Sequence, residues 1–160
     1  MKPSQFALAD SPLHLLHRVS QIADEIFSQH TANLEVTSRQ FIVLQAIDAA
    51  RKTNQQKLVR RTGIDRSTLA DIVRRLAKQG MVQRERSEDD AREYVVSLTD
   101  KARAILQAVQ SAQETIETEL LKPLPAGYRR DLLRSLQTIA KAFPEENRTI
   151  KKSAKSENPD

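Results

Sequence analysis

The feature that most constrains the fold of this chain is a turn between two helical segments within residues 54–80. The Thr-Gly-Ile sequence at 62–64 predicts a tight turn, because glycine adopts backbone conformations that strain other residues. Asn54 before the turn and Asp65 after it are residue types that cap helix N-termini. A short helix, a turn with glycine and a longer helix that stops at Gly80 are together typical of a helix-turn-helix.

The second helix of this pair is amphipathic. At about 100° per residue, its apolar side chains fall on one face and are predicted to be core: Leu69, Ile72, Val73 and Leu76. In a helix-turn-helix the N-terminal part of this helix enters the DNA major groove, where arginine bonds guanine and hydroxyls bond phosphates or bases. The candidate DNA-binding residues of this helix are Arg66, Ser67, Thr68, Ala70, Asp71, Arg74, Arg75 and Lys78.

Asp71 is the exception on this basic face, because its carboxylate would repel phosphate. Two roles are open for it. It accepts a hydrogen bond from a cytosine amine, or it holds Arg74 or Arg75 in place.

The positive charge of the chain is concentrated around the same two helices. Residues 51–80 hold nine Lys and Arg and two acidic residues, a net charge of +7, whereas the whole chain has a net charge of +5. A basic run alone is often only a solvated face. Combined with the helix-turn-helix pattern, it favours double-stranded DNA as the partner over a protein-interaction surface.

The rest of the chain reads as helices and one hairpin, so the expected fold class is mainly α with a small β part. Residues 81–86 and 93–97 predict two strands, since Val and Tyr favour strands. Capping signals begin further helices at Ser11, Thr37 and Thr99. A polar stretch at 51–53 separates two helices, and prolines precede a last helix that ends near 143.

The helix predicted from Thr99 to residue 121 is long for a chain of this size. Its apolar stripe is too extensive to be buried in one protomer, which predicts a seam between two copies of the chain. Charging Leu106 is expected to abolish the dimer or the fold. The stripe comprises Ala102, Ile105, Leu106, Val109, Ala112, Ile116 and Leu120.

Several function classes are excluded by what the sequence lacks. The chain has no Cys, and it shows no glycine-rich phosphate loop and no nucleophile elbow, so neither an enzyme nor a cofactor is predicted. His14 and His17 have helical spacing for a metal, but no clustered carboxylate accompanies them, and no metal site is predicted. No apolar run approaches the ~20 residues that span a bilayer, and the first residues do not lead us to expect an export signal. We expect a cytoplasmic protein that makes no membrane contact.

The sequence resembles the MarR family of bacterial winged helix-turn-helix transcription regulators. The resemblance is carried by residues 62–69, by their spacing to Gly80, and by Asp90-Ala91-Arg92 ahead of Leu98-Thr99. It implies a homodimer in which two winged lobes read a pseudo-palindromic operator. It also implies dimerisation helices at 1–36 and 99–143 and a winged helix-turn-helix domain at 37–98. The tail at 144–160 is charged and polar without a core-forming stripe, so we expect it to be disordered.

The resemblance also assigns roles in the hairpin, or wing. It implies that Arg92 enters the minor groove, that Asp90 orients the wing, and that Arg84 and Arg86 support the strand or reach phosphate. The wing is unusually acidic. Either its carboxylates point away and pin arginines, or the wing contacts DNA weakly. These carboxylates belong to Glu85, Glu88, Asp89 and Glu93.

Finally, the resemblance implies a repressor that a small aromatic or anionic ligand releases, an aromatic acid or its thioester being one class. Histidine and arginine can bind a carboxylate through charge-assisted hydrogen bonds. The candidate ligand-binding residues are His14, His17, Arg18, Arg39 and Phe41. Alternatively, these side chains cap helices, cross the dimer seam or are solvated. The alternative function is a constitutive DNA-binding protein without an effector.

Overall fold

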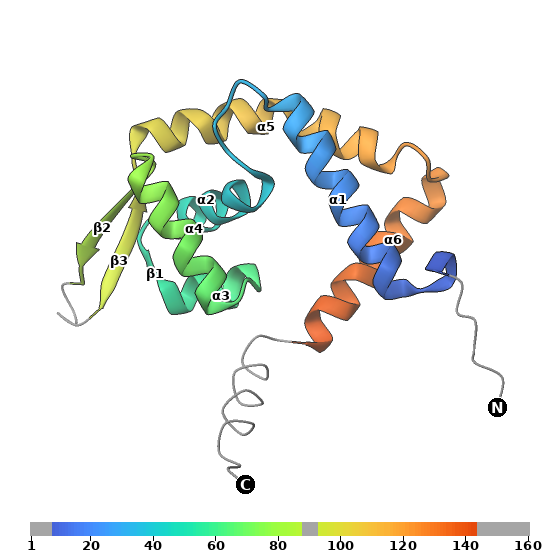
Figure 1. The fold of residues 1–160 in the computed structure, drawn as a ribbon, viewed down its shortest axis with the longest axis horizontal. Coiled ribbons are helices and arrows are strands. Elements are labelled where there is room, and N and C mark those ends of the chain that lie inside the picture. The colour runs from blue at the N-terminus through green and yellow to red at the C-terminus, as the bar shows by residue number, and fades with distance from the viewer. Residues whose placement is uncertain (1–7, 88–92, 144–160) are drawn as a thin grey trace, which may run out of the picture.

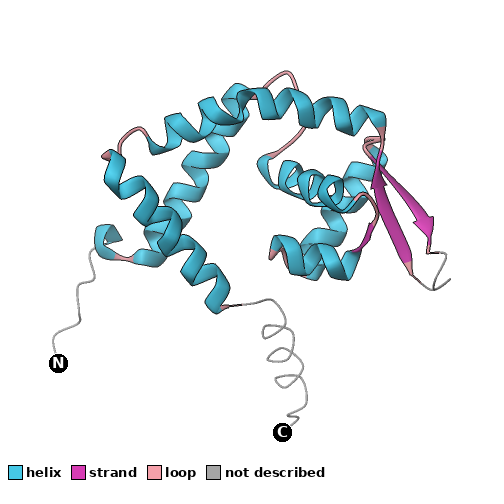
Figure 2. Cartoon of the chain, turned by 180° about the vertical axis from the view of Figure 1, so that it is seen from behind, coloured by secondary structure: helices cyan, strands magenta, loops and turns pink. Residues whose placement is uncertain are grey.

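The computed structural model describes residues 8–87 and 93–143. They form a mainly helical fold with one small antiparallel sheet (Figures 1 and 2). A short 3-10 helix precedes six α-helices and three strands. The helices are α1 (Pro12–His30), α2 (Ser38–Ala50), α3 (Gln55–Thr62), α4 (Arg66–Lys78), α5 (Asp100–Leu121) and α6 (Ala126–Ala142). The strands are β1 (Thr53–Asn54), β2 (Val82–Arg86) and β3 (Tyr94–Leu98).

Side-chain caps begin five of the helices, and all five were predicted from the sequence. In each case a side-chain oxygen accepts a hydrogen bond from a backbone N–H three residues later, which satisfies one of the orphan donors at the helix start. At Thr37 the Gln40 side chain also bonds back to the Thr37 N–H, which completes the predicted capping box. The capping residues are Ser11, Thr37, Asn54, Asp65 and Thr99.

The turn between α3 and α4 has the predicted glycine conformation. Gly63 follows α3 with φ of 68°, in the left-handed region that favours glycine. Its N–H donates to the carbonyl of Val59, which ends α3. The helix-turn-helix predicted over 54–80 is therefore present.

The sheet has the strand order β1-β3-β2, and both pairings are antiparallel. The β2–β3 hairpin was predicted, but its register was not. In the structure Arg86 lies opposite Tyr94 and Val82 lies opposite Leu98. Strand β1 was not predicted. Residues 51–53 were expected to be a polar stretch between two helices, whereas Thr53 pairs with Val96. Two residues are too few for strand alternation, so only the distant partner strand reveals this element.

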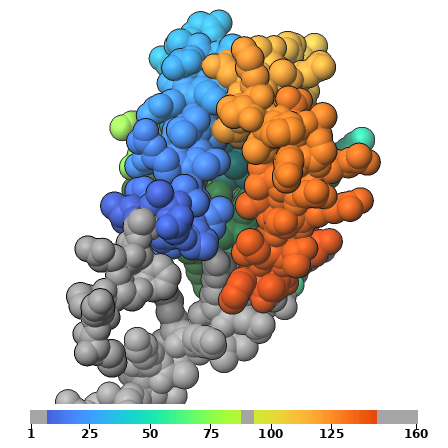
Figure 3. All heavy atoms as spheres, turned by 90° about the vertical axis from the view of Figure 1, so that its right-hand side faces the viewer, coloured from blue at the N-terminus to red at the C-terminus, as the bar shows by residue number. Residues whose placement is uncertain are grey.

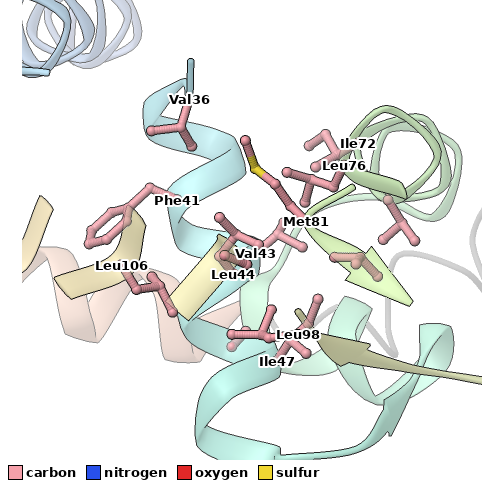
Figure 4. Close-up of a cluster of buried hydrophobic side chains, with 14 of the residues drawn as sticks. Val36, Phe41, Val43, Leu44, Ile47, Ile72, Leu76, Met81, Leu98 and Leu106 are labelled. Atoms are coloured by element: carbon pink, nitrogen blue, oxygen red, sulfur yellow. The ribbon is translucent and has the colours of Figure 1, made fainter. Parts of the chain in front are cut away.

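The core lies where α2, α4, the sheet and α5 meet (Figure 4). Leu44, Leu69 and Leu76 are fully buried there. The first half of α5 belongs to this core, since Ala102 and Val109 are fully buried and Leu106 is 4% exposed within one chain. The prediction that the Leu106 region forms a dimer seam is therefore wrong, because α2 and the sheet supply the apolar cover within the protomer.

Helix α6 lies outside this core, and α1 reaches it with Phe27, near the end of the helix. Figure 3 shows a face on which both helices expose side chains to solvent. Over its described residues 126–142, α6 has no buried residue, and in α1 only Ile26 and Phe27, near its end, are buried. No helix in the described ranges 8–87 and 93–143 is long and apolar enough to cross a membrane.

Candidate nucleic-acid interface and an adjoining groove

Helix α4 separates its apolar and polar side chains onto two faces, as predicted. Leu69, Ile72, Val73 and Leu76 are buried. The predicted DNA-binding residues of α4 lie away from this core: Arg66, Ser67, Ala70, Arg74, Arg75 and Lys78 are exposed, while Thr68 and Asp71 are half-buried. The structure thus places one small residue and several cations together on an open helix face.

The start of α4 is fixed by Asp65. Its Oδ1 accepts hydrogen bonds from the Ser67 hydroxyl (2.7 Å) and from the Thr68 N–H (3.0 Å). Hydrogen bonds from the side chains of Thr68 and Ser67 hold the pKa of Asp65 well below its usual range. The Ser67 hydroxyl therefore serves the helix cap in the unbound protein, and a DNA contact by Ser67 stays a prediction.

Asp71 is paired with both neighbouring arginines. Its Oδ2 lies 2.9 Å from Nε of Arg75, and its Oδ1 accepts a hydrogen bond from Nη2 of Arg74. These are i,i+3 and i,i+4 pairs on one helix face. Of the two roles left open for Asp71, the structure shows the one in which it holds the arginines.

Among its described residues, the wing carries basic and acidic side chains on opposite faces. Arg84 and Arg86 share a face with Tyr94, and their guanidinium carbons lie 5.0 and 5.9 Å from the Tyr94 ring centroid. On the other face Glu85 binds Lys52 (3.1 Å), and Glu93 accepts a hydrogen bond from the amide of Asn54 (3.0 Å). These two carboxylates point away, as one of the two alternatives predicted. That alternative also predicted arginines as their partners, whereas their described partners near β1 are a lysine and an amide. Glu88, Asp89, Asp90 and Arg92 lie outside the described residues.

A groove of about 340 Å³ lies between α1, α2 and α5. Arg39 and Phe41, two of the five predicted ligand-binding residues, line it. His14, His17 and Arg18 do not; they lie on the exposed N-terminal half of α1. Phe27 was not predicted to bind the ligand. Its ring lies 5.7 Å from that of Phe41, and it lines the same groove. Helical spacing alone shows which residues share a helix face, not which part of α1 crosses α2.

The charges around this groove are mixed. Arg39 supplies a cation, while Asp24 and Glu117 supply carboxylates. Asp24 accepts a hydrogen bond from the Ser38 hydroxyl, so part of its acceptor capacity is used within the protein. The groove therefore combines two aromatic rings with one guanidinium and two carboxylates.

A second groove, of about 480 Å³, lies between the start of α2 and the end of α4. Lys78 and Arg75 line it, and the Gln40 and Gln79 side chains are hydrogen-bonded across it (3.4 Å). Among the residues that the structure describes, no aromatic side chain lines this groove. It offers an aromatic ligand no stacking surface.

The helix-turn-helix of α3 and α4, followed by the β2–β3 hairpin, defines a winged helix-turn-helix protein. The MarR family model matches residues 36–94. The HTH-type transcriptional repressor NicR of Pseudomonas putida is 32% identical over 126 residues, which cover 79% of this chain and 80% of NicR. The chain belongs to the MarR family.

Solved structures agree with this assignment. Bordetella bronchiseptica BpsR, a protein whose DNA binding is regulated by 6-hydroxynicotinic acid, has a TM-score of 0.79 and 25% identity, over 86% of this chain and 99% of that one. A mutant of E. coli MarR in complex with operator DNA has a TM-score of 0.76 and 29% identity, over 85% and 99% of the two chains. The relatives are named transcriptional regulators, and this chain is a transcriptional regulator rather than an enzyme.

Proposed function

We propose that this chain is a homodimeric repressor that binds a pseudo-palindromic operator and is released by a small aromatic acid or its thioester. The observation that carries DNA binding is the exposed face of α4, where Arg74, Arg75 and Lys78 lie opposite a fully packed core face. Arginine and lysine on an accessible helix are the donors that reach guanine edges and phosphates in the major groove. That NicR is named a repressor supports the direction of control.

The dimer is supported by apolar side chains that one chain leaves uncovered. Leu13 of α1 is 68% exposed, and Leu133 and Ile139 of α6 are 50% and 52% exposed. Soluble proteins rarely leave many large apolar side chains clustered in water, so such a surface marks an interface. We propose that residues 1–36 and 99–143 dimerise, with the first half of α5 also completing the core of the winged domain at 37–98.

An effector in the groove between α1, α2 and α5 would touch both parts of the chain. Phe27 and Phe41 offer stacking partners for an aromatic ring, and Arg39 offers a charge-assisted hydrogen bond to a carboxylate. A ligand that binds better to one arrangement of α1 and α2 than to another shifts the population of DNA-competent dimers. The 6-hydroxynicotinic acid that regulates BpsR is an aromatic acid, which supports an effector of this chemical class here.

The test is a titration of the purified protein against the DNA upstream of its own gene. Binding is measured at two salt concentrations, with and without a panel of aromatic acids and their thioesters, against random DNA of equal length. Affinity for the upstream DNA that falls steeply with salt and is relieved by one compound supports the proposal. If that DNA is not preferred, a genome-wide selection follows, and the absence of any preferred sequence overturns specific binding. Specific binding that no small molecule relieves favours the constitutive alternative.

A further inference from the structure

Tyr94 is an exposed aromatic residue on the wing that holds two arginines. Its side chain is 46% exposed, and the guanidinium carbons of Arg84 and Arg86 lie 5.0 and 5.9 Å from its ring centroid. Both distances are within the range in which a cation is attracted to the negative face of a ring.

The strand register explains why these three side chains meet. Arg86 is directly opposite Tyr94 in the β2–β3 pair, and Arg84 is opposite Val96, which makes it the diagonal neighbour of Tyr94. Directly opposed and diagonal neighbours are the cross-strand positions that aromatic and long side chains can bridge. Nearer the base of the hairpin, the same face carries the buried residues Val82, Val96 and Leu98.

The described carboxylates of the hairpin, Glu85 and Glu93, lie on the opposite face. Glu85 faces the opposite side, where it binds Lys52, and Glu93 is hydrogen-bonded to Asn54. In the described strands 82–86 and 94–98, no carboxylate alternates onto the face of Tyr94. The hairpin projects beyond the helices, with its outer end on the same side of the molecule as α3 (Figures 1 and 2). The face thus combines two cations with a rigid ring at the edge of the helix-turn-helix.

We infer that Tyr94 is a positioning residue, whose ring holds the guanidinium groups of Arg84 and Arg86 in place for the phosphodiester backbone of DNA. This inference rests on the proposed DNA binding. A long arginine side chain loses rotamer freedom when it binds a phosphate, and a ring that already restrains it lowers that cost. The phenol oxygen has no part in this role, because the attraction comes from the face of the ring.

The test compares Tyr94→Phe with Tyr94→Ile. Phenylalanine keeps the ring, whereas isoleucine keeps strand propensity but removes it. We expect Tyr94→Phe to bind operator DNA like the unmodified protein and Tyr94→Ile to bind roughly two- to fivefold more weakly for each guanidinium that loses its ring contact. The plot of log affinity against log salt should become less steep in Tyr94→Ile, because fewer phosphates are neutralised.

Equal affinity and equal salt dependence for the two variants would overturn the inference, even if the unmodified protein binds its operator. Failure of the unmodified protein to bind any operator would instead overturn the proposed function. A measurement without DNA completes the test. In the NMR spectrum of the free protein, the side-chain resonances of Arg84 and Arg86 should be shifted upfield by the ring and return to ordinary positions in Tyr94→Ile. Ordinary positions in the unmodified protein would contradict the stack whatever the variants do.

Discussion

Asp71 and Arg75 form an ion pair on the exposed face of α4, with 2.9 Å between the carboxylate Oδ2 and the guanidinium Nε. The other oxygen of the same carboxylate is bonded to Arg74. One carboxylate thus orients Arg74 and Arg75, two of the three arginines of α4. It also places a negative charge where phosphates would approach, so Asp71 should improve discrimination between sequences at a cost in general affinity.

Asp71→Asn tests this balance. Without the carboxylate, the arginines are freer to reach any phosphate, so affinity for random DNA should rise and the ratio of operator to random affinity should fall. Fluorescence anisotropy with both DNAs at two salt concentrations measures the two effects. Asp100→Asn is the matched control, because Asp100 also pairs with an arginine, Arg103 at 2.8 Å, but at the start of α5. An unchanged ratio in Asp71→Asn would show that the pair does not contribute to discrimination.

Arg74→Ala should weaken operator binding by about 1–3 kcal/mol, the cost of losing a base or phosphate contact. The Arg74 side chain is 76% exposed, so its removal should leave the folded dimer intact. Operator affinity at matched salt and the mass from light scattering check the two expectations separately. A dimer with undiminished operator affinity would remove Arg74 from the interface.

Two leucines should respond differently to a charge. Leu106 is buried inside the protomer, so Leu106→Glu should destabilise the fold by on the order of 3–5 kcal/mol through an unpaired buried carboxylate. Leu133 is 50% exposed in the single chain, so Leu133→Glu should leave the fold intact and weaken the dimer. Circular dichroism measures folding and light scattering measures mass. A Leu133→Glu protein that remains dimeric at micromolar concentration would place the interface elsewhere.

The sequence predicted local structure better than long-range contacts. The physical reason is the separation along the chain between the residues that interact. The caps at Asn54 and Asp65 depend on hydrogen bonds to residues three positions away, so a short window of sequence contains all the information. Strand β1 depends on Val96, over forty residues away, and periodicity cannot detect it.

The candidate sites show the same limit. The exposed face of α4 follows from one helix, and it was predicted almost completely. The groove requires the crossing of three helices. There the sequence identified Arg39 and Phe41 but missed Phe27, and its candidate His14 does not line the groove. The Tyr94 stack was also missed, although an aromatic opposite a basic residue across a predicted hairpin is a signal that a register assignment would have revealed.

Asp65 should make stability depend on pH in the acidic range. Its pKa is lowered in the folded protein, so its stabilising contribution is complete above the unfolded value of about 4. It is lost progressively as the pH falls toward the folded pKa, because only the unfolded chain then binds the proton. Asp65→Asn keeps a good N-cap without a titrating group. Urea unfolding from pH 7 to pH 3 should therefore show a steeper loss for the unmodified protein than for Asp65→Asn. Parallel curves would mean that Asp65 does not contribute to the acid sensitivity.

Arg39→Ala should reduce the response to an aromatic carboxylate without affecting operator binding. Arg39 supplies the guanidinium of the groove between α1, α2 and α5, and a charge-assisted hydrogen bond to a carboxylate is strong enough to change ligand affinity about tenfold. Arg18→Ala is the matched control, since Arg18 is an exposed arginine of α1 that does not line the groove. The concentration of ligand that releases half of the operator complex should rise in Arg39→Ala and stay constant in Arg18→Ala. A rise confined to Arg18→Ala would move the effector site to the N-terminal half of α1, where the sequence alone had also placed it.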